Sequence, residues 1–270
     1  MKRTAVIGAN GFLGRKLLSV YMERGHSVTA VYNRNFHNIP NSSQALSFDH
    51  FINGDLFFDN IVFAAGNFSS THEELIALNC KGLLEITARY PNARLVYISS
   101  TNVYGTHTST INEDSTFNIP TLYGRAKLAG EFIVSALKSF AIIRLAYLYG
   151  PGLQNKSFLP TIINDALHNK KIVLMGKGER EQDYLHVNDA ADLCFAATNY
   201  PENGVFLGAT GQSISNIEVA KNVCAKIDCC LIEFTGEERG TSFYFDPVQT
   251  FDKLNWRPKV AFIDGIKSCI

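Results

Sequence analysis

The feature that most constrains the fold is a glycine-rich segment near the N-terminus, which spells GANGFLG over residues 8–14. Residues 2–7 before it are β-prone and apolar at their end, which predicts a short strand. Residues 12–24 after it predict a helix, because one helical face carries Leu13, Leu17, Leu18 and Tyr21. Strand, glycine turn and helix therefore follow one another directly.

Each glycine of this segment has a separate role if the turn binds a dinucleotide. Gly8 would allow the tight turn, Gly11 would let backbone amides approach a pyrophosphate, and Gly14 would let the helix pack close to the strand. The spacing is GxxGxxG rather than GxGxxG, but the position between a strand and a helix favours nucleotide binding over an ordinary turn. The residues of the turn predicted to bind the cofactor are Gly8, Asn10, Gly11, Phe12, Leu13 and Gly14.

Length and composition bound the architecture. At 270 residues the chain exceeds one typical Rossmann unit, yet it is too short for two large independent domains. Apolar residues make up 46% and charged residues 19%, so a sizeable core is available. We therefore expect an α/β protein with a Rossmann-like doubly wound parallel sheet and a small C-terminal substrate-binding cap domain.

Charge and hydrophobicity limit the partners and the location. Lys plus Arg and Asp plus Glu both number 25, and no basic run occurs, which argues against nucleic acid or an anionic membrane as the main partner. A small-molecule ligand is expected instead. The glycine turn interrupts the first apolar stretch, which is therefore neither a signal-peptide core nor a membrane span, and we expect a cytoplasmic protein.

Six cysteines are scattered along the chain without CxxC spacing. Most lie in stretches that predict buried helix or strand, so we expect reduced thiols. The adjacent Cys229 and Cys230 are the one pair that suggests redox or metal chemistry. No His lies near them in sequence, and packing is the favoured explanation.

The end of the second predicted strand bears on the choice of cofactor. This strand covers residues 27–32 and is followed by Asn33, Arg34 and Asn35. No carboxylate is present there to bind the adenosine ribose 2′-hydroxyl, whereas an Arg suits a 2′-phosphate. Arg34 thus slightly favours NADP(H) over NAD(H). The alternative, about equally weighted, is a solvated loop charge.

Two later strands end at the carboxyl edge, where open α/β sheets bind ligands. One is a fully apolar strand over residues 60–66, and three of its residues are expected to line the cofactor: Ala64, Ala65 and Gly66. The other, over residues 94–98, follows a predicted helix over residues 73–88 and delivers Ser100 to this edge.

Tyr123 and Lys127 form the third feature of the candidate site. A helix begins at Tyr123, and the four-residue spacing places both side chains on one face. Of eleven tyrosines, only Tyr123 has a lysine four residues later. Such a pair occurs by chance in many chains. It indicates a catalytic site only because the serine-bearing strand end and the glycine turn are also present.

Several segments together resemble the extended short-chain dehydrogenase/reductase superfamily, in its NAD(P)-dependent nucleotide-sugar epimerase/dehydratase/reductase branch. These are GANGFLG, SSTNVYG, YGRAK, IRLAYLYGPG (143–152) and DYLHVNDAA (183–191). The weaker segments GATGQSISNIEVA (208–220) and LNWRPKVAFIDGI (254–266) resemble parts of the branch's cap. The resemblance covers nearly the whole chain.

The resemblance implies hydride exchange between a nicotinamide and a carbinol or carbonyl carbon, with no metal. Tyr123 would carry the coupled proton. The ammonium of Lys127 would lower the pKa of this phenol from about 10 and hold the nicotinamide ribose. Ser100 would hydrogen-bond the substrate oxygen. The implied catalytic residues are thus Ser100, Tyr123 and Lys127.

Departures from the branch concern the reaction and the substrate. Its 4,6-dehydratases carry an acidic pair after the hydroxyl residue, whereas this chain has Thr101 and Asn102. Dehydration is therefore not expected, which leaves C4 epimerisation or reduction of a 4-keto sugar. Tyr147 and Gln182 replace an Asn and an Arg that usually help to hold the nucleotide diphosphate, and Arg180 could substitute. The predicted substrate-binding residues are Thr101, Asn102, Tyr147 and Arg180.

The resemblance also implies domain boundaries and alternatives. Residues 1–152 plus 183–200 are expected to form the dinucleotide-binding Rossmann domain, and residues 153–182 plus 201–270 the small substrate-binding domain. A homodimer would form through the helix that carries Tyr123 and Lys127. Besides the nucleotide-sugar enzyme, a reductase of another small carbonyl compound and a non-catalytic NADP-sensing regulator remain open.

Overall fold

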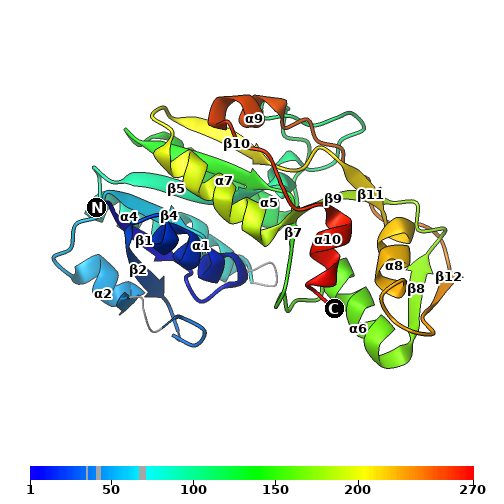
Figure 1. Ribbon diagram of the computed structural model, residues 1–270. Helices are drawn as coiled ribbons and strands as arrows, with labels where there is room; N and C mark the ends of the chain where they lie inside the picture. Colours follow the sequence, from blue (N-terminus) through cyan, green and yellow to red (C-terminus); the bar gives the residue numbers. More distant parts are fainter. Residues whose placement is uncertain (35, 41–43, 67–70) are drawn as a thin grey trace.

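Seven parallel strands form the central sheet of the computed structural model, in the order β10-β6-β5-β4-β1-β2-β3 (Figure 1). The strands are β1 Arg3–Ile7, β2 Ser27–Tyr32, β3 Gln44–Ser47, β4 Asn60–Phe63, β5 Arg94–Ser100, β6 Phe140–Leu145 and β10 Gly204–Gly208. The structure describes residues 1–34, 36–40, 44–66 and 71–270, and Asn35 in the segment after β2 lies outside these ranges. The predicted doubly wound parallel sheet is confirmed.

Helices cover both faces of this sheet, as its composition requires. Alternate strand residues such as Val6, Val62 and Val96 pack against α1 (Phe12–Glu23) and α7 (Val187–Asn199). The residues between them pack against α2 (Phe48–Asn53), α4 (Gly82–Arg89) and α5 (Leu122–Ser135). Strands buried on both faces must be apolar throughout, which explains the continuous apolar run of β4.

The predicted helix over residues 73–88 is divided in the structure. It consists of α3 (His72–Ile76), a π-helical turn (Ala77–Lys81) and α4. The turn contains the buried Asn79, whose Nδ2 donates to the Leu75 carbonyl oxygen at 2.9 Å. The Tyr97 hydroxyl donates to Asn79 Oδ1 at 2.8 Å, so this polar residue is satisfied inside the core.

A second, smaller layer has its own core. Its strands form a three-stranded sheet, β11-β9-β7, and a parallel pair, β12-β8. The bounds are β7 Tyr147–Tyr149, β8 Lys171–Met175, β9 Glu181–His186, β11 Ser213–Ser215, β12 Leu231–Thr235, α6 Phe158–Asn169, α8 Asn216–Cys224 and α10 Phe262–Lys267. Leu159, Ile163 and Val219 belong to the core cluster between them. In the described ranges, no helix has the length and apolar character needed to cross a membrane.

The predicted domain division differs from the strand pairing at four elements. β7 and most of β9 fall in the predicted large domain, yet they pair with each other, and β9 pairs with β11, in the smaller layer. β10 and the helix α9 (Val248–Leu254) fall in the predicted small domain, yet they lie with the large sheet.

β10 pairs in parallel with β6, from Gly204 opposite Ala141 to Gly208 opposite Leu145, and so belongs to the large sheet. The neighbouring helix α9 joins it there, where Leu207 N donates to Thr250 Oγ1 at 2.7 Å. After β10 the chain crosses to the small layer for β11, α8 and β12, and it returns to the large sheet at α9. The rest of the predicted division stays a prediction.

The expectation of reduced cysteines is wrong for two of the six. Cys224 and Cys230 form a disulfide, because the turn between α8 and β12 brings their Cα atoms to 5.1 Å. Cys229 is exposed in a left-handed backbone conformation at φ 58°, so packing does not explain it. The free cysteines of the described chain are Cys80, Cys194, Cys229 and Cys269.

Candidate active site

The glycine turn lies between β1 and α1 and leaves the helix start open. Gly8 has φ +81°, and a Cβ added there would lie 2.7 Å from the Cα of Ala65. A Cβ at Gly14 would lie 2.1 Å from the Gly8 carbonyl oxygen, so neither position has room for a side chain. Gly11 is the N-cap of α1, with no side-chain cap and no acidic residue in the first turn. The first amides of α1 are thus available to an anion.

These features fit the pyrophosphate of a dinucleotide. The loop after β4, with Ala64, Ala65 and Gly66, runs beside the turn, and Ala64 N donates to the Ile7 carbonyl oxygen at 2.9 Å. Asn10 lies in the turn, while Phe12 and Leu13 open α1. The predicted cofactor residues, apart from Arg34, therefore gather along the carboxyl ends of β1 and β4, with Tyr123 and Lys127 beside them.

Lys127 is buried beneath the ends of β4 and β5. Its Nζ donates to the carbonyl oxygens of Ile98 at 3.0 Å and Ala65 at 3.4 Å. The same atom lies 5.0 Å from the centre of the Tyr97 ring and 5.9 Å from that of Tyr123. The amine is held in place by two strand ends and two aromatic rings.

Tyr123 and Lys127 converge on one point next to Gly66. A Cβ added at Gly66 would lie 3.4 Å from Lys127 Nζ and 3.8 Å from Tyr123 Oη. Both polar atoms therefore face the end of the β4 loop, on the side of the glycine turn. The four-residue spacing on α5 produces this convergence, as the sequence indicates.

Burial sets the protonation of this pair. It raises the pKa of the Tyr123 phenol to about 12 and lowers the pKa of the Lys127 amine to about 7, because desolvation penalises each charged form. The Glu131 carboxylate opposes the second shift. The predicted net fall of the Tyr123 pKa below its ordinary value is wrong for this structure, because burial of the phenol outweighs any favourable effect of the Lys127 ammonium on the phenolate. At neutral pH, Tyr123 is protonated and can donate.

Ser100 ends β5 and begins a 3₁₀ turn (Thr101–Tyr104). Its Oγ accepts from Asn102 N at 3.2 Å and from Asn102 Nδ2 at 3.0 Å. A Cβ at Gly124 would lie 2.2 Å from the Asn102 carbonyl oxygen, so the first turn of α5 packs directly on this segment. Ser100 and Tyr123 are thereby held on adjoining elements, and in the turn after Ser100, Thr101 is buried and Asn102 half-buried.

A buried ion pair supports these elements from behind, and sequence reasoning missed it. Arg144 on β6 pairs with Glu131 on α5, Nη2 to Oε2 at 2.7 Å, and each side chain is 6% exposed. Ser99 Oγ also donates to Glu131. Arg144 Nη1 further donates to Tyr104 Oη at 2.9 Å and to the Glu113 carbonyl oxygen at 3.0 Å. The sequence feature that could have indicated this pair is that Glu131 and Arg144 are charged residues within otherwise apolar segments.

The remaining predicted substrate residues lie on the small layer. Tyr147 is half-buried on β7, with its ring centre 6.1 Å from that of Tyr184. Arg180 precedes β9, and its Nε donates to the Thr241 carbonyl oxygen at 3.0 Å. With the Gln182 amide oriented to satisfy both groups, its oxygen accepts from Arg180 Nη1 at 2.8 Å and Nη2 at 2.7 Å. The guanidinium of Arg180 therefore lies at the side chain of Gln182, the position where the branch usually has its Arg.

Arg34 and His186 stand apart from the convergent groups. Arg34 is 80% exposed and pairs with Glu74 at 3.3 Å, which leaves both interpretations of Arg34 open. His186 is buried, and its Nδ1 accepts from Asn188 N at 3.2 Å, so it caps α7 as a structural residue. No group of three or more metal-ligating side chains occurs among the residues that the structure describes.

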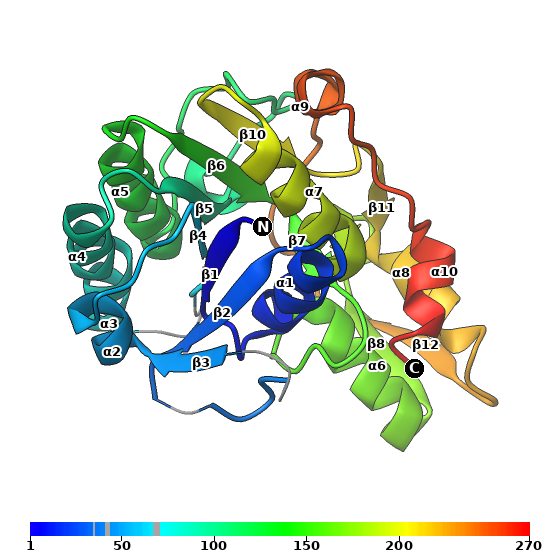
Figure 2. The ribbon, with the colours of Figure 1, turned by 60° about the vertical axis from the view of Figure 1, so that its left-hand side comes forward.

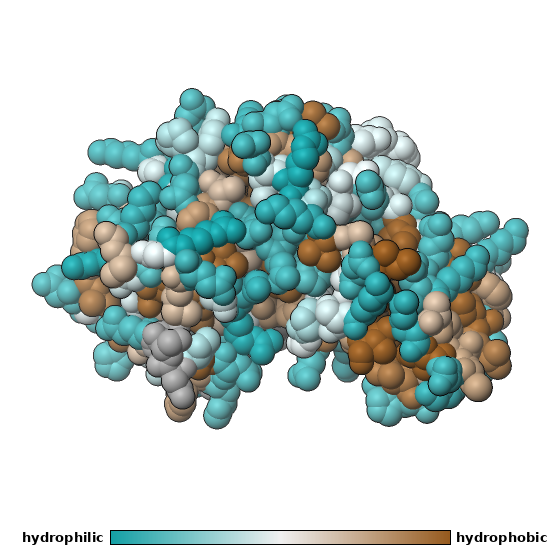
Figure 3. Space-filling view, viewed as in Figure 1, coloured by the Kyte–Doolittle hydropathy of each residue, from teal (hydrophilic) through white to brown (hydrophobic). Residues whose placement is uncertain are grey.

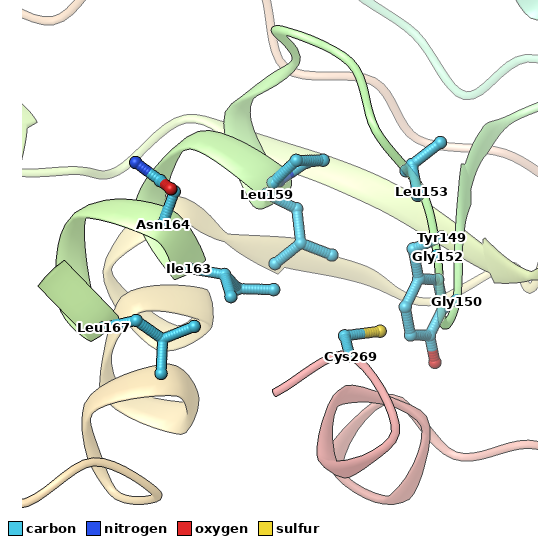
Figure 4. Close-up of a pocket in the computed structure, with 10 residues that line it drawn as sticks. Tyr149, Gly150, Gly152, Leu153, Leu159, Ile163, Asn164, Leu167 and Cys269 are labelled. Carbon is cyan, nitrogen blue, oxygen red and sulfur yellow. The ribbon is translucent and has the colours of Figure 1, made fainter.

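A cavity of about 180 Å³ lies in the small layer between α6 and the segment after β7 (Figure 4). Its lining includes Tyr149, Leu159, Ile163 and Cys269. On the same side of the molecule, hydrophobic side chains gather over α6 and α10 (Figure 3). The lining carries none of the predicted catalytic residues.

The parallel sheet, the open glycine turn and the Ser100, Tyr123 and Lys127 set define a dinucleotide-binding protein of the extended short-chain dehydrogenase/reductase type. The chain belongs to the NAD dependent epimerase/dehydratase family, whose model matches residues 4–207. Metal-free catalysis, the cap and the residue roles in this chain remain predictions.

Curated relatives from several organisms match parts of the chain. It is 29% identical over 185 residues to dTDP-D-glucose 4,6-dehydratase of Dictyostelium discoideum, covering 62% of this chain and 41% of that protein. It is 26% identical over 257 residues to UDP-N-acetyl-alpha-D-glucosaminuronate decarboxylase of Bacillus cytotoxicus, covering 82% and 79%. This chain spans 41%, 64% and 54% of the lengths of three dTDP-glucose 4,6-dehydratases, those of Dictyostelium discoideum, Streptomyces niveus and Mus musculus.

Solved structures share the fold over nearly the whole chain. MoeE5 in complex with UDP-glucuronic acid and NAD superimposes with a TM-score of 0.85 at 21% identity, over 99% of this chain and 97% of that one. ADP-L-glycero-D-manno-heptose-6-epimerase of Helicobacter pylori gives a TM-score of 0.88 at 18% identity, over 98% and 94%. At these identities the similarity is one of fold.

Proposed function

We propose that this protein is an NAD(P)-dependent oxidoreductase or epimerase that transfers hydride at C4 of a nucleotide-activated sugar. The observation that carries the proposal is the convergence of Tyr123 Oη and Lys127 Nζ beside Gly66, next to the Ser100 end of β5. The matched family and the nucleotide-sugar names of its relatives support the substrate class. When bound, the nicotinamide would supply or accept the hydride.

The residues of this chain account for the proton side of such a reaction. Tyr123 is protonated at neutral pH, so its hydroxyl donates the proton to the substrate oxygen as that oxygen gains charge. The phenolate that remains is stabilised by the ammonium form of Lys127. Ser100 donates a hydrogen bond to the same oxygen and orients it.

Dehydration is excluded from the proposal by the side chains next to Ser100. Eliminating water from a sugar needs an additional acid and base. Thr101 offers a hydroxyl and Asn102 an amide, and the amide is bonded to Ser100. Reduction of a 4-keto sugar or C4 epimerisation remains.

The small layer is proposed to hold the nucleotide diphosphate. Arg180 is positioned by Thr241 and Gln182, and its guanidinium matches phosphate in a bidentate manner. Tyr147 on β7 is proposed to contact the sugar or the base. This assignment keeps residues 153–182 in the substrate domain.

The test is a panel assay with NADH and NADPH against nucleotide 4-keto sugars and simple ketones, and with NAD⁺ and NADP⁺ against UDP-glucose. Reduction or C4 epimerisation of a nucleotide sugar is the expected result. Turnover of simple ketones alone would favour the reductase of another small carbonyl compound. Cofactor binding without any turnover would favour a regulator.

The cofactor proposal is a slight preference for NADP(H) through Arg34. Because the Arg34 side chain is exposed, an added contact to a 2′-phosphate should be modest, about fivefold in affinity. Calorimetric titration should show NADPH binding more tightly than NADH, and Arg34→Ala should remove the difference. Equal affinities in the parent protein would make Arg34 a loop charge and would leave NAD(H) as suitable a cofactor as NADP(H).

We also propose a homodimer through the flank that carries α5. Helices α3, α4 and α5 lie on one flank (Figure 2), and each carries an exposed apolar side chain: Ile76, Leu84 and Phe132. Light scattering should give a dimer mass for the parent, and Phe132→Lys should shift it to a monomer. The control is Phe234→Lys, because the Phe234 side chain on β12 is also exposed. The protein with this substitution should stay dimeric. A monomeric parent would contradict the proposal.

A further inference from the structure

Both acceptor positions of the Ser100 hydroxyl are used within its own turn. Asn102 N and Asn102 Nδ2 donate to Ser100 Oγ at 3.2 and 3.0 Å. A serine hydroxyl has two lone pairs and one proton. Among the residues that the structure describes, no acceptor takes this proton, so the hydroxyl offers a donor to the site and no free lone pair.

We infer that Asn102 is a positioning residue that fixes Ser100 as a hydrogen-bond donor to the oxygen of a carbonyl substrate. The inference rests on the proposed function and narrows it toward reduction of a 4-keto sugar. A carbonyl oxygen can only accept, and it accepts from two donors at once. Ser100 and the protonated Tyr123 are two such donors, and both bonds strengthen as the oxygen becomes negative during reduction.

The turn that carries Asn102 is held by the packing of its main chain. The main-chain carbonyl oxygen of Asn102 lies against the backbone of Gly124, where even a Cβ would have no room. Thr101 and Val103 on either side are buried, so the turn is anchored on both sides of Asn102. A carboxylate at position 102 would instead accept the Ser100 proton, and a methyl group would leave only the main-chain N–H of residue 102 to orient the hydroxyl.

Two substitutions at this position test the inference with UDP-4-keto-6-deoxyglucose and NADH as the probe. Asn102→Asp should lower kcat/KM about 100-fold at pH 8, comparable with the loss of one oxyanion donor. Asn102→Ala should lower it about tenfold, because the donor is present but less firmly oriented. NADH affinity should be unchanged in both. The control Asn118→Asp alters an exposed amide that bonds the Thr106 carbonyl oxygen in the same loop, and it should keep parent activity.

The pH profile separates positioning from damage to the fold. In Asn102→Asp, the protonated carboxyl group can donate to Ser100 Oγ as the native amide does, so the activity ratio of this variant to parent should rise as pH falls toward 5. A ratio that is constant with pH would overturn the inference. In a Ser100→Ala background, Asn102→Ala should cost nothing further; an undiminished tenfold cost would show that Asn102 acts on the substrate itself.

A second double-mutant cycle needs no substrate. The free energies of unfolding of Ser100→Ala, Asn102→Ala and the double variant should be non-additive, since the two side chains are bonded. Additive values would show that the bond does not exist and would overturn the inference. If the parent reduces no nucleotide 4-keto sugar, the proposed function fails, and this unfolding cycle still decides the bond.

Discussion

Tyr123→Phe should lower turnover of a nucleotide 4-keto sugar by about 10³-fold while cofactor affinity stays within a few-fold. The lost hydroxyl is the proton donor, and general acid catalysis contributes on the order of 10²–10⁴-fold. The ring that contacts Lys127 Nζ remains, so the cofactor side of the site is little disturbed. Steady-state kinetics and NADH titration measure the two quantities.

The matched control is Tyr200→Phe, which removes a hydroxyl at the end of α7 that bonds only Glu202 among the contacts described. It should retain parent activity. Undiminished turnover by Tyr123→Phe would remove the phenol from the mechanism.

Glu131→Met should lower the free energy of unfolding by about 3–5 kcal/mol, which is the usual cost of leaving a buried charge unpaired. Arg144 would keep only its bonds to Tyr104 and the Glu113 carbonyl oxygen. At about 2–4 °C per kcal/mol for a chain of this size, Tm should fall by about 10 °C. Urea and thermal unfolding measure both changes.

The double variant Glu131→Met/Arg144→Met should recover most of that loss, because apolar replacement of a whole buried pair is often neutral. An exposed pair gives the contrast. Lys171 and Glu233 are bonded at 2.9 Å on the β8-β12 pair, and Glu233→Gln should cost under about 1 kcal/mol. Equal losses from Glu131→Met and Glu233→Gln would contradict this account of the pair.

The parts of the site that depend on local sequence were predictable. Gly14 in the glycine turn is required by Gly8 and Ala9 within the same strand-turn-helix unit, whereas Gly8 also meets Ala65, which is distant in sequence. Likewise, Tyr123 and Lys127 meet because both lie on one face of α5. These patterns extend over at most a few turns of chain.

Features that depend on distant contacts were not predictable. β10 has the apolar character of any buried strand, and only its pairing with β6 places it in the large sheet. The sign of the Tyr123 pKa shift depends on burial, which the Tyr-Lys spacing does not reveal. The 3₁₀ turn in which the Asn102 side chain donates to Ser100 has its main chain against Gly124, which is distant in sequence.

The most direct test of the central claim is a single turnover with protein in excess over a nucleotide 4-keto sugar and deuterium at the transferring position of NADH or NADPH. A reductase and an epimerase both act on this keto form. We expect deuterium on C4 of the sugar, detected by NMR of the product, and none with Tyr123→Phe over the time in which the parent protein completes its turnover. Deuterium that stays on the cofactor with every nucleotide 4-keto sugar, while a simple ketone becomes labelled, would contradict it.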